Sequence, residues 1–253
     1  MIITISPAKI LDFETPPTIE KKTKPVFEKD AHYLNEILKD LSANEIGTLM
    51  NINPKITLDV YQYVQSFGIG RAPKKQTALA YNGMVYLGLD SKTFSENDWD
   101  FAQKHLTILS GLYGALKPFD IIHPYRLEMH TKVANDRGVD LYAYWRKTLT
   151  EYLSKQLKAN GNIWLNLASN EYSKAIDKKA LDKKVRIITP SFKQDTPKGY
   201  KQIVVYAKKA RGLMSRFVIQ NQITTIDGLK EFDTEGYSFS PSLSNGDDWV
   251  FIR

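Results

Sequence analysis

The chain has 253 residues, of which 42% are hydrophobic and 25% charged, with a formal net charge of +7 and a pI near 9.2. It contains no cysteine, which excludes disulfides, thiolate metal sites and cysteine nucleophiles. It has neither an apolar run of the roughly 18 residues that a membrane span requires nor the basic start of a secretion signal. We therefore expect a cytoplasmic globular protein with no membrane partner, and the positive charge favours a polyanionic one.

Up to residue 106 the sequence predicts a strand, several helices and a hairpin. The strand is the apolar, β-branched run 2–6, which ends at Ser6-Pro7. Apolar residues at helical spacing predict helices over residues 27–41, 42–50, 54–67 and 95–106. Capping boxes that begin at Ser42 and Ser95 mark the starts of the second and fourth of these helices. The run 78–89 alternates around Asn82-Gly83, a dipeptide typical of tight β-hairpins.

The second half of the chain mixes helices and strands without a strict βαβ order. A glycine-bearing turn region over 109–118 precedes a helix that is predicted over 141–157. Strands are predicted over residues 163–168, 185–188, 200–206 and 249–252. No internal repeat and no linker interrupts the pattern. The predicted fold class is therefore α/β, or mixed α+β: a single compact domain over 1–253, in which helices surround a mixed sheet.

The segment 206–219 is predicted to form a basic amphipathic helix that follows the strand 200–206. At about 100° per residue its apolar side chains fall on one face. The opposite face carries four cations and no acid: Lys208, Lys209, Arg211 and Arg216. Such a stripe favours an anionic partner, for which a nucleic-acid backbone is the usual candidate. The alternative is a solvated helix face with no partner.

The segment Asn51-Ile-Asn-Pro-Lys55 joins two predicted helices in the pattern of a helix-hairpin-helix element over about 42–67. Asparagine stands where such hairpins normally use glycine, and it is the next most tolerant residue of left-handed backbone. The second helix would direct its first amides and Lys55 at a phosphate, with Asn51 and Asn53 shaping the turn. An ordinary turn between two helices is the alternative.

Polar residues follow several predicted strands, where α/β proteins place ligand sites. Lys9, just beyond the first strand, could bind phosphate or act as base or nucleophile, and Asp12 could orient it. Glu128 and Glu171 are further candidate acids or bases, and Arg126 is expected to pair with Glu128 or to clamp a ligand. A salt bridge at Lys9 and a helix cap near Glu171 are the structural alternatives.

The segment from His123 to His130 contains two histidines and Glu128, which raises iron or zinc binding as a hypothesis. Their spacing matches no standard metal motif, so we predict no metal site and no cofactor. The sequence also lacks a phosphate loop, a dinucleotide fingerprint, a serine nucleophile elbow and the kinase motifs.

Eight segments together carry a resemblance to a known family, and they are spread over nearly the whole length of the chain. They are Ser6-Pro-Ala-Lys-Ile-Leu-Asp-Phe13, Phe94-Ser-Glu96, Leu109-Ser-Gly-Leu-Tyr-Gly114, Pro118-Phe-Asp120, Pro124-Tyr-Arg-Leu-Glu-Met129, Asn166-Leu-Ala-Ser169 with Glu171-Tyr172, Tyr206 to Phe217, and Glu235-Gly-Tyr237. With these segments the chain resembles the YaaA family of bacterial peroxide-stress proteins. One departure is Ile10, where threonine is common in the family, so no role of Lys9 should depend on that hydroxyl.

The resemblance implies a compact fold peculiar to the family, with a basic cleft and a helix-hairpin-helix element. It implies binding to double-stranded and branched DNA. It also implies a role in limiting free intracellular iron, and with it DNA damage, during peroxide stress. No obligate protein partner is predicted.

Our leading hypothesis is a structure-selective, sequence-tolerant DNA-binding protein in which Lys9, Lys117 and Arg126 line one cleft. The phosphate contacts would also come from the basic helix and from the hairpin. A rival hypothesis is an enzyme that acts on a nucleotide, a nucleobase or a nucleic acid. It requires Lys9, Asp12, Glu128 and Glu171 to converge on one pocket. A third hypothesis is an iron-binding protein built around His123, Glu128 and His130.

Overall fold

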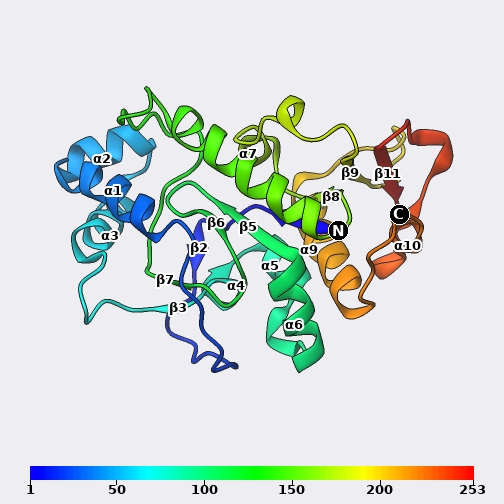
Figure 1. Ribbon diagram of the computed structural model, residues 1–253, viewed down its shortest axis with the longest axis horizontal. Coiled ribbons are helices and arrows are strands. Elements are labelled where there is room, and N and C mark those ends of the chain that lie inside the picture. Colours follow the sequence, from blue (N-terminus) through cyan, green and yellow to red (C-terminus); the bar gives the residue numbers. More distant parts are fainter.

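The computed structural model describes all 253 residues, and a seven-stranded sheet forms its centre (Figure 1). The strand order is β10-β11-β9-β8-β1-β5-β6. The parallel strands are β1 (Ile2–Ile5), β5 (Leu106–Ser110), β8 (Ile163–Asn166), β9 (Arg186–Lys193) and β11 (Asp248–Ile252). The antiparallel edge strands are β6 (Gly114–Leu116) and β10 (Ser238–Phe239). The sheet is therefore mixed, and the predicted α/β class is confirmed.

Helices surround this sheet. The longer ones are α1 (Glu28–Lys39), α2 (Ala43–Met50), α3 (Pro54–Ser66), α6 (Glu96–His105), α7 (Leu141–Ala159) and α9 (Val204–Gln220). The shorter ones are α4 (Thr77–Ala80), α5 (Met84–Leu89), α8 (Asn170–Ser173) and α10 (Ile226–Lys230), with 3-10 turns η1 (Ser91–Thr93), η2 (Lys178–Ala180), η3 (Thr234–Gly236) and η4 (Pro241–Leu243). Figure 1 shows α1, α2 and α3 grouped at one end of the molecule and α10 with β11 at the other. No helix is long and apolar enough to cross a membrane.

Strand β1 lies in the middle of the sheet and is buried along its whole length. Ile3 pairs with Leu106 on one side and with Leu165 on the other, so both of its edges are used. A central parallel strand is buried on both faces, so its sequence is a nearly continuous apolar run. The one polar side chain, Thr4, is satisfied because it accepts a hydrogen bond from Trp164 Nε1 at 2.8 Å and donates to Asn166 at 3.3 Å.

Two short antiparallel pairs lie outside the main sheet. Strand β2 (Ile10–Leu11) pairs with β4 (Tyr81–Asn82), and β3 (Lys75–Gln76) pairs with β7 (Ile121–Ile122). The first pair fixes the segment that follows β1, because it joins Lys9's loop to the chain just before α5. The loop between β1 and β2 is thus held at both ends.

Several local predictions are confirmed. Both capping boxes are present, with the Ser42 hydroxyl accepting from the Glu45 amide and the Ser95 hydroxyl accepting from the Asp98 amide. The helix predicted over 141–157 extends from Leu141 to Ala159. These features are encoded within a few residues of chain, which is why the sequence alone reveals them.

Two predicted elements are wrong. The hairpin expected around Asn82-Gly83 does not form, because β4 pairs with β2 instead and the chain becomes helical at Met84. The strand expected over 200–206 is absent as well, since only a single bridge joins Lys201 to Gln194 and helix α9 already begins at Val204. In both places a partner distant in sequence decides the structure.

Candidate functional site

The carboxyl ends of three parallel strands meet at one edge of the sheet. From β1 the sheet extends through β5 on one side and through β8 on the other, which makes this edge a topological switch point. Ser6 follows β1, and its hydroxyl accepts a hydrogen bond from the Ser169 amide at 2.9 Å beyond β8. The Tyr86 hydroxyl donates to the Ser6 carbonyl at 3.1 Å. The strand ends are thus tied together, which gives a rigid base for a site.

A buried ion cluster lies on this base, and Glu128 is its centre. Only 5% of Glu128 is exposed. Its Oε1 accepts a hydrogen bond from Arg126 Nε at 3.2 Å and forms ion pairs with Lys9 Nζ at 3.0 Å and Arg126 Nη2 at 3.1 Å. Its Oε2 is buried and has no hydrogen-bond partner. Burial alone would raise the pKa of Glu128, but the bonds and charges of Lys9 and Arg126 outweigh it and hold that pKa below its usual value.

A chain of three hydroxyls lies beside the ion cluster. The Tyr125 hydroxyl is 2.6 Å from Ser110 Oγ and 2.5 Å from the Tyr81 hydroxyl. Ser110 Oγ also accepts from the Tyr113 amide at 3.0 Å, which anchors the chain to the end of β5. Burial raises the pKa of Tyr125 to about 12, with the charge of Glu128 among the lesser causes. The tyrosines therefore stay protonated at neutral pH and can act as hydrogen-bond donors.

The structure brings together part of the predicted catalytic set. Lys9, Arg126 and Glu128 are in contact, and the expected pairing of Arg126 with Glu128 is confirmed. Glu171 instead pairs with the exposed His130, at 2.8 Å. The four-group convergence that the enzyme hypothesis required is therefore not observed.

Asp12 belongs to a separate ion cluster. Its carboxylate accepts from the Thr15 amide and lies 3.4 Å from Nζ of the buried Lys75 and 3.6 Å from Nζ of Lys92. The backbone bond from Thr15, and then the charge of Lys75, lower the pKa of Asp12 to about 2 despite partial burial. Asp12 therefore anchors the loop around β2, and the prediction that it orients Lys9 is wrong.

The predicted metal ligands are also separated. His123 Nδ1 bonds to the Pro73 carbonyl at 3.0 Å, whereas His130 pairs with Glu171 and Glu128 pairs with two cations. No three histidine or acidic side chains are grouped so that they could hold a metal ion. The hypothesis of an iron site around these three residues is therefore not supported by their placement.

Lys117 does not line the same cleft as Lys9. Strand β6 runs antiparallel to β5, with Gly114 opposite Ser110 and Leu116 opposite Ile108. Lys117 therefore lies towards the amino end of β5, at the edge of the sheet opposite the ion cluster, where its Nζ donates to the Lys104 carbonyl at 3.2 Å. The reversal at β6 is a tertiary feature that the sequence did not reveal.

Lys117 and Asp120 give the protein a pH-dependent stability. Burial raises the pKa of Asp120 to about 6, against hydrogen bonds from the Lys117 amide and Thr23, so stability should fall as the pH rises from 3.8 to about 6. Burial lowers the pKa of Lys117 to about 8, so stability should rise again between about 8 and 10.5. Asp120→Asn should flatten the first change, which is on the order of 3 kcal/mol. Urea denaturation at several pH values measures this change in the free energy of unfolding. Asp59→Asn is an exposed control and should keep the pH dependence of the wild type. An unaltered pH dependence in Asp120→Asn would contradict the assignment.

The basic helix α9 does not present a free stripe of four cations. Lys208 is exposed, but Lys209 pairs with Glu235. Arg216 donates to the carbonyl oxygens of Leu89 and Asp90, at 3.2 and 2.9 Å. Burial lowers the pKa of Arg211, which is half-buried. The stripe has no acid of its own, as predicted, but its cations are not all free, because acids and carbonyls from other segments approach this helix.

The turn between α2 and α3 has the predicted form of two helices joined by a short connection. Asn51 ends α2 in left-handed backbone with φ 49° and ψ 56°, a conformation that asparagine tolerates. The Asn53 side chain caps α3 by accepting from the Ile56 amide at 3.0 Å. Lys55 is exposed in the first turn of α3, which contains no acid. A short connection between two helices is therefore present, whereas its identity as a helix-hairpin-helix element and its contact with DNA stay predictions.

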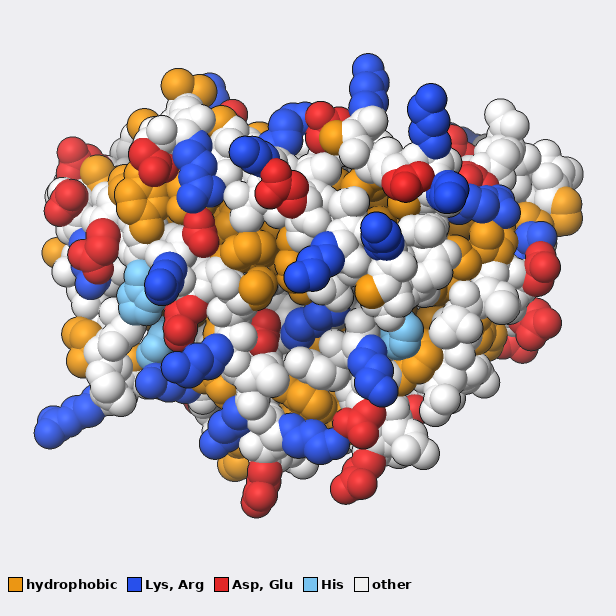
Figure 2. Space-filling view, viewed as in Figure 1, with side chains coloured by type: hydrophobic (Ala, Val, Ile, Leu, Met, Phe, Trp, Pro, Cys, Tyr) orange, Lys and Arg blue, Asp and Glu red, His pale blue; other side chains and the backbone are white.

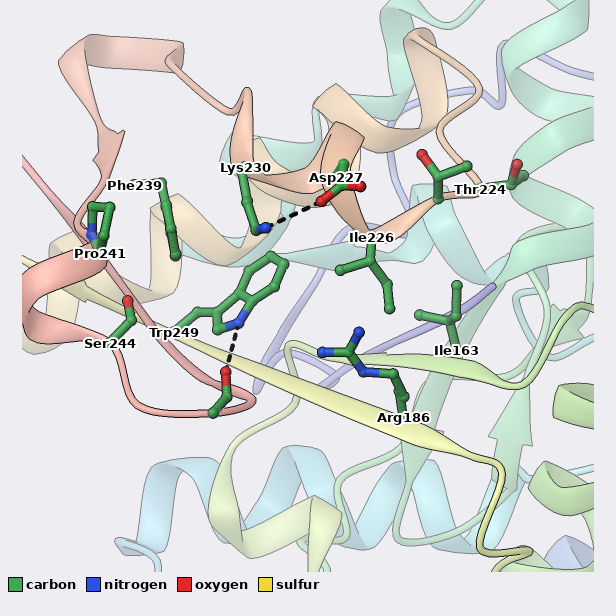
Figure 3. A pocket seen from close by; sticks show the side chains of 12 residues that line it. Ile163, Arg186, Thr224, Ile226, Asp227, Lys230, Phe239, Pro241, Ser244 and Trp249 are labelled. Carbon is green, nitrogen blue, oxygen red and sulfur yellow. Dashed lines mark hydrogen bonds and ion pairs between the residues drawn. The ribbon is translucent and has the colours of Figure 1, made fainter.

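A large hollow of about 600 Å³ lies elsewhere, between β9, β11 and α10 (Figure 3). Arg186 and Lys230 point towards it, but Arg186 pairs with Asp247 at 2.5 Å and Lys230 with Asp227 at 3.1 Å. The Trp249 indole donates to the Gly246 carbonyl at 3.1 Å. Because both cations in this hollow are paired with acids, it offers an anionic ligand less free charge than the strand-end cluster, by which we mean the Glu128 ion cluster and the neighbouring hydroxyl chain.

Comparison with known proteins identifies the family. Residues 1–243 match the family model described as peroxide stress protein YaaA. The chain belongs to the YaaA family. It is also similar to UPF0246 proteins, with 48% identity to one from Saccharophagus degradans over 100% of this chain and 99% of that relative. A relative from Burkholderia pseudomallei strain 668 is 46% identical over 100% of this chain and 98% of its own. Membership supports a role in peroxide stress.

The segments that carry the YaaA resemblance supply most of the strand-end cluster. Lys9 comes from the first segment, Ser110 from the third, and Tyr125, Arg126 and Glu128 from one segment of six residues. Ser110, Tyr125 and Tyr81 were not among the predicted site residues. Ser110 and Tyr125 lie inside these segments, which is a signal that the sequence offers, whereas Tyr81 lies in none of them.

Proposed function

We propose that this YaaA-family protein binds double-stranded and branched DNA through backbone phosphates, without reading the sequence, and so limits DNA damage during peroxide stress. The observation that carries the proposal is the turn between α2 and α3. Its left-handed Asn51 and capped Asn53 present the start of α3 to solvent, and Lys55 adds a charge there. Helix N-termini attract anions because their first amides lack partners within the helix.

Charge on the surface supports the same proposal. Figure 2 shows lysine and arginine side chains spread across the middle of one face of the molecule. Of the predicted contacts, Lys55 and Lys208 are exposed, and Lys9 exposes 64% of its side chain. Lys209, Arg211, Arg126 and Arg216 have structural partners or are largely buried, so we assign them a smaller share of phosphate binding.

The test is a salt titration of binding to fluorescent duplex and four-way-junction DNA. Each phosphate contact adds about one unit to the slope of log affinity against log salt. Lys55→Ala should reduce that slope by about one unit and weaken binding to all sequences alike. Lys183→Ala is the matched control, because Lys183 lies in the loop before β9, well away from α2 and α3 in Figure 1. An unchanged slope and affinity for Lys55→Ala would remove the turn from the footprint.

A further inference from the structure

We propose that the cluster at the carboxyl ends of β1, β5 and β8 is a binding site for a nucleobase that carries a phosphate nearby. The site would hold the adjacent hydrogen-bond donor and acceptor of the base edge, and Lys9 with Arg126 would attract the phosphate. This goes beyond backbone binding at the α2–α3 turn, from which the cluster is distinct in sequence and in fold.

The acceptor in this site is Glu128 Oε2. The side chain is more than nine-tenths buried, and all three of its donors go to the other oxygen, Oε1. Oε2 is left without a partner. A buried carboxylate oxygen without a donor is costly, and a ligand N–H would remove that cost.

The donor comes from the hydroxyl chain of Ser110, Tyr125 and Tyr81. These three groups have three protons but only two hydroxyl–hydroxyl contacts, at 2.6 and 2.5 Å. Ser110 Oγ has one further bond, in which it accepts from the Tyr113 amide. Whichever way the three hydroxyls are oriented, one O–H has no acceptor within the chain and is therefore free to donate. Tyr125, the middle hydroxyl of the chain, directly precedes Arg126, which pairs with Glu128, so the donor and the acceptor come from one short segment.

Lys9 is the exchangeable partner of Glu128. Its side chain is 64% exposed where it pairs with Glu128, and an ion pair with an exposed partner is weak and easily rearranged. Lys9 and Arg126 carry two positive charges against the single charge of Glu128. An incoming anion that draws Lys9 aside would neutralise the excess charge and leave Glu128 Oε1 to Arg126. A nucleotide combines such an anion with adjacent N–H and carbonyl groups, and so does a base in DNA.

Isothermal titration of the full chain with UMP tests the proposal. Ribose 5-phosphate lacks the base, and 3-methyl-UMP lacks the N–H, so each should bind about tenfold more weakly than UMP. Glu128→Gln should cause a similar loss, because its amide oxygen would stay with Lys9 and Arg126 and its NH2 would face the ligand N–H. Glu151→Gln, at an exposed position, is the control and should bind as the wild type does.

The comparison of UMP with 3-methyl-UMP uses only the wild-type protein, so it holds even if Glu128→Gln does not fold. Equal affinity for UMP, 3-methyl-UMP and ribose 5-phosphate, or no binding of any, would overturn the proposal. A duplex with a T·T mismatch identifies the source of the base: tighter binding than to the matched duplex, lost in Glu128→Gln, assigns it to DNA. Binding of UMP without that preference assigns it to a free nucleotide. The salt slope of Lys55→Ala on matched duplex tests the phosphate contacts separately.

Discussion

Replacing Gly212 with alanine should lower the free energy of unfolding by about 3 kcal/mol or more. Helices α5 and α9 cross in direct backbone contact at this residue. A Cβ on Gly212 would lie 1.8 Å from the Val85 carbonyl oxygen, and one on Gly88 would lie 2.2 Å from the Lys209 carbonyl oxygen. Backbone atoms cannot turn aside as a flexible side chain can, so the two helices must separate.

The separation would also break the contacts of Arg216 with the carbonyl oxygens of Leu89 and Asp90. Guanidinium denaturation followed by tryptophan fluorescence measures the loss. Gly70→Ala is the control, because no atom lies within 4 Å of the added Cβ, and its effect should stay within about 0.5 kcal/mol. A Gly212→Ala variant as stable as the wild type would show that the two helices do not cross here.

The elements that could be predicted from the sequence are those with local causes. The strand that ends at Ser6 and the helix that begins at Leu141 follow from periodicity. The starts of α2 and α6 follow from the side chains of Ser42 and Ser95. Each of these signals spans a few residues, so no knowledge of the tertiary structure is required.

The elements that could not be predicted depend on partners distant in sequence. Asn82-Gly83 does not form a hairpin because β2, about seventy residues earlier, takes up the adjacent strand. The cations of α9 looked free because Glu235 and Asp90, which approach Lys209 and Arg216, come from other segments. Periodicity within a helix says nothing about such neighbours.

The residues of the candidate site also divide into those that local sequence identifies and those that depend on partners distant in sequence. Lys9 could be placed near a ligand edge because it follows a buried strand, and Arg126 could be paired with Glu128 because they lie two residues apart. Asp12 was misplaced because its partner, Lys75, is a buried lysine that nothing in the local sequence marks. The hydroxyl chain joins Tyr81, Ser110 and Tyr125, which only the fold brings together.

Arg126→Met should destabilise the protein by about 3 kcal/mol at neutral pH. Arg126 supplies two of the three nitrogen contacts to Glu128 Oε1 and exposes only 17% of its side chain. Its removal leaves a buried carboxylate whose remaining partner, Lys9, lies in solvent. Methionine fills a similar volume, so the loss should arise from the uncompensated charge and not from a cavity.

The pH dependence identifies that cause. In the wild type the pKa of Glu128 is lowered, so its stabilising contribution is present at neutral pH and is lost as the pH falls through the carboxyl range. Without Arg126 burial dominates and raises this pKa, so the variant takes up a proton more readily than the wild type. The stability difference between the two should therefore shrink as the pH falls from 7 to 4. Arg126→Met combined with Glu128→Gln should recover much of the loss at pH 7, whereas a difference that is the same at every pH would show that Arg126 stabilises the fold by packing alone.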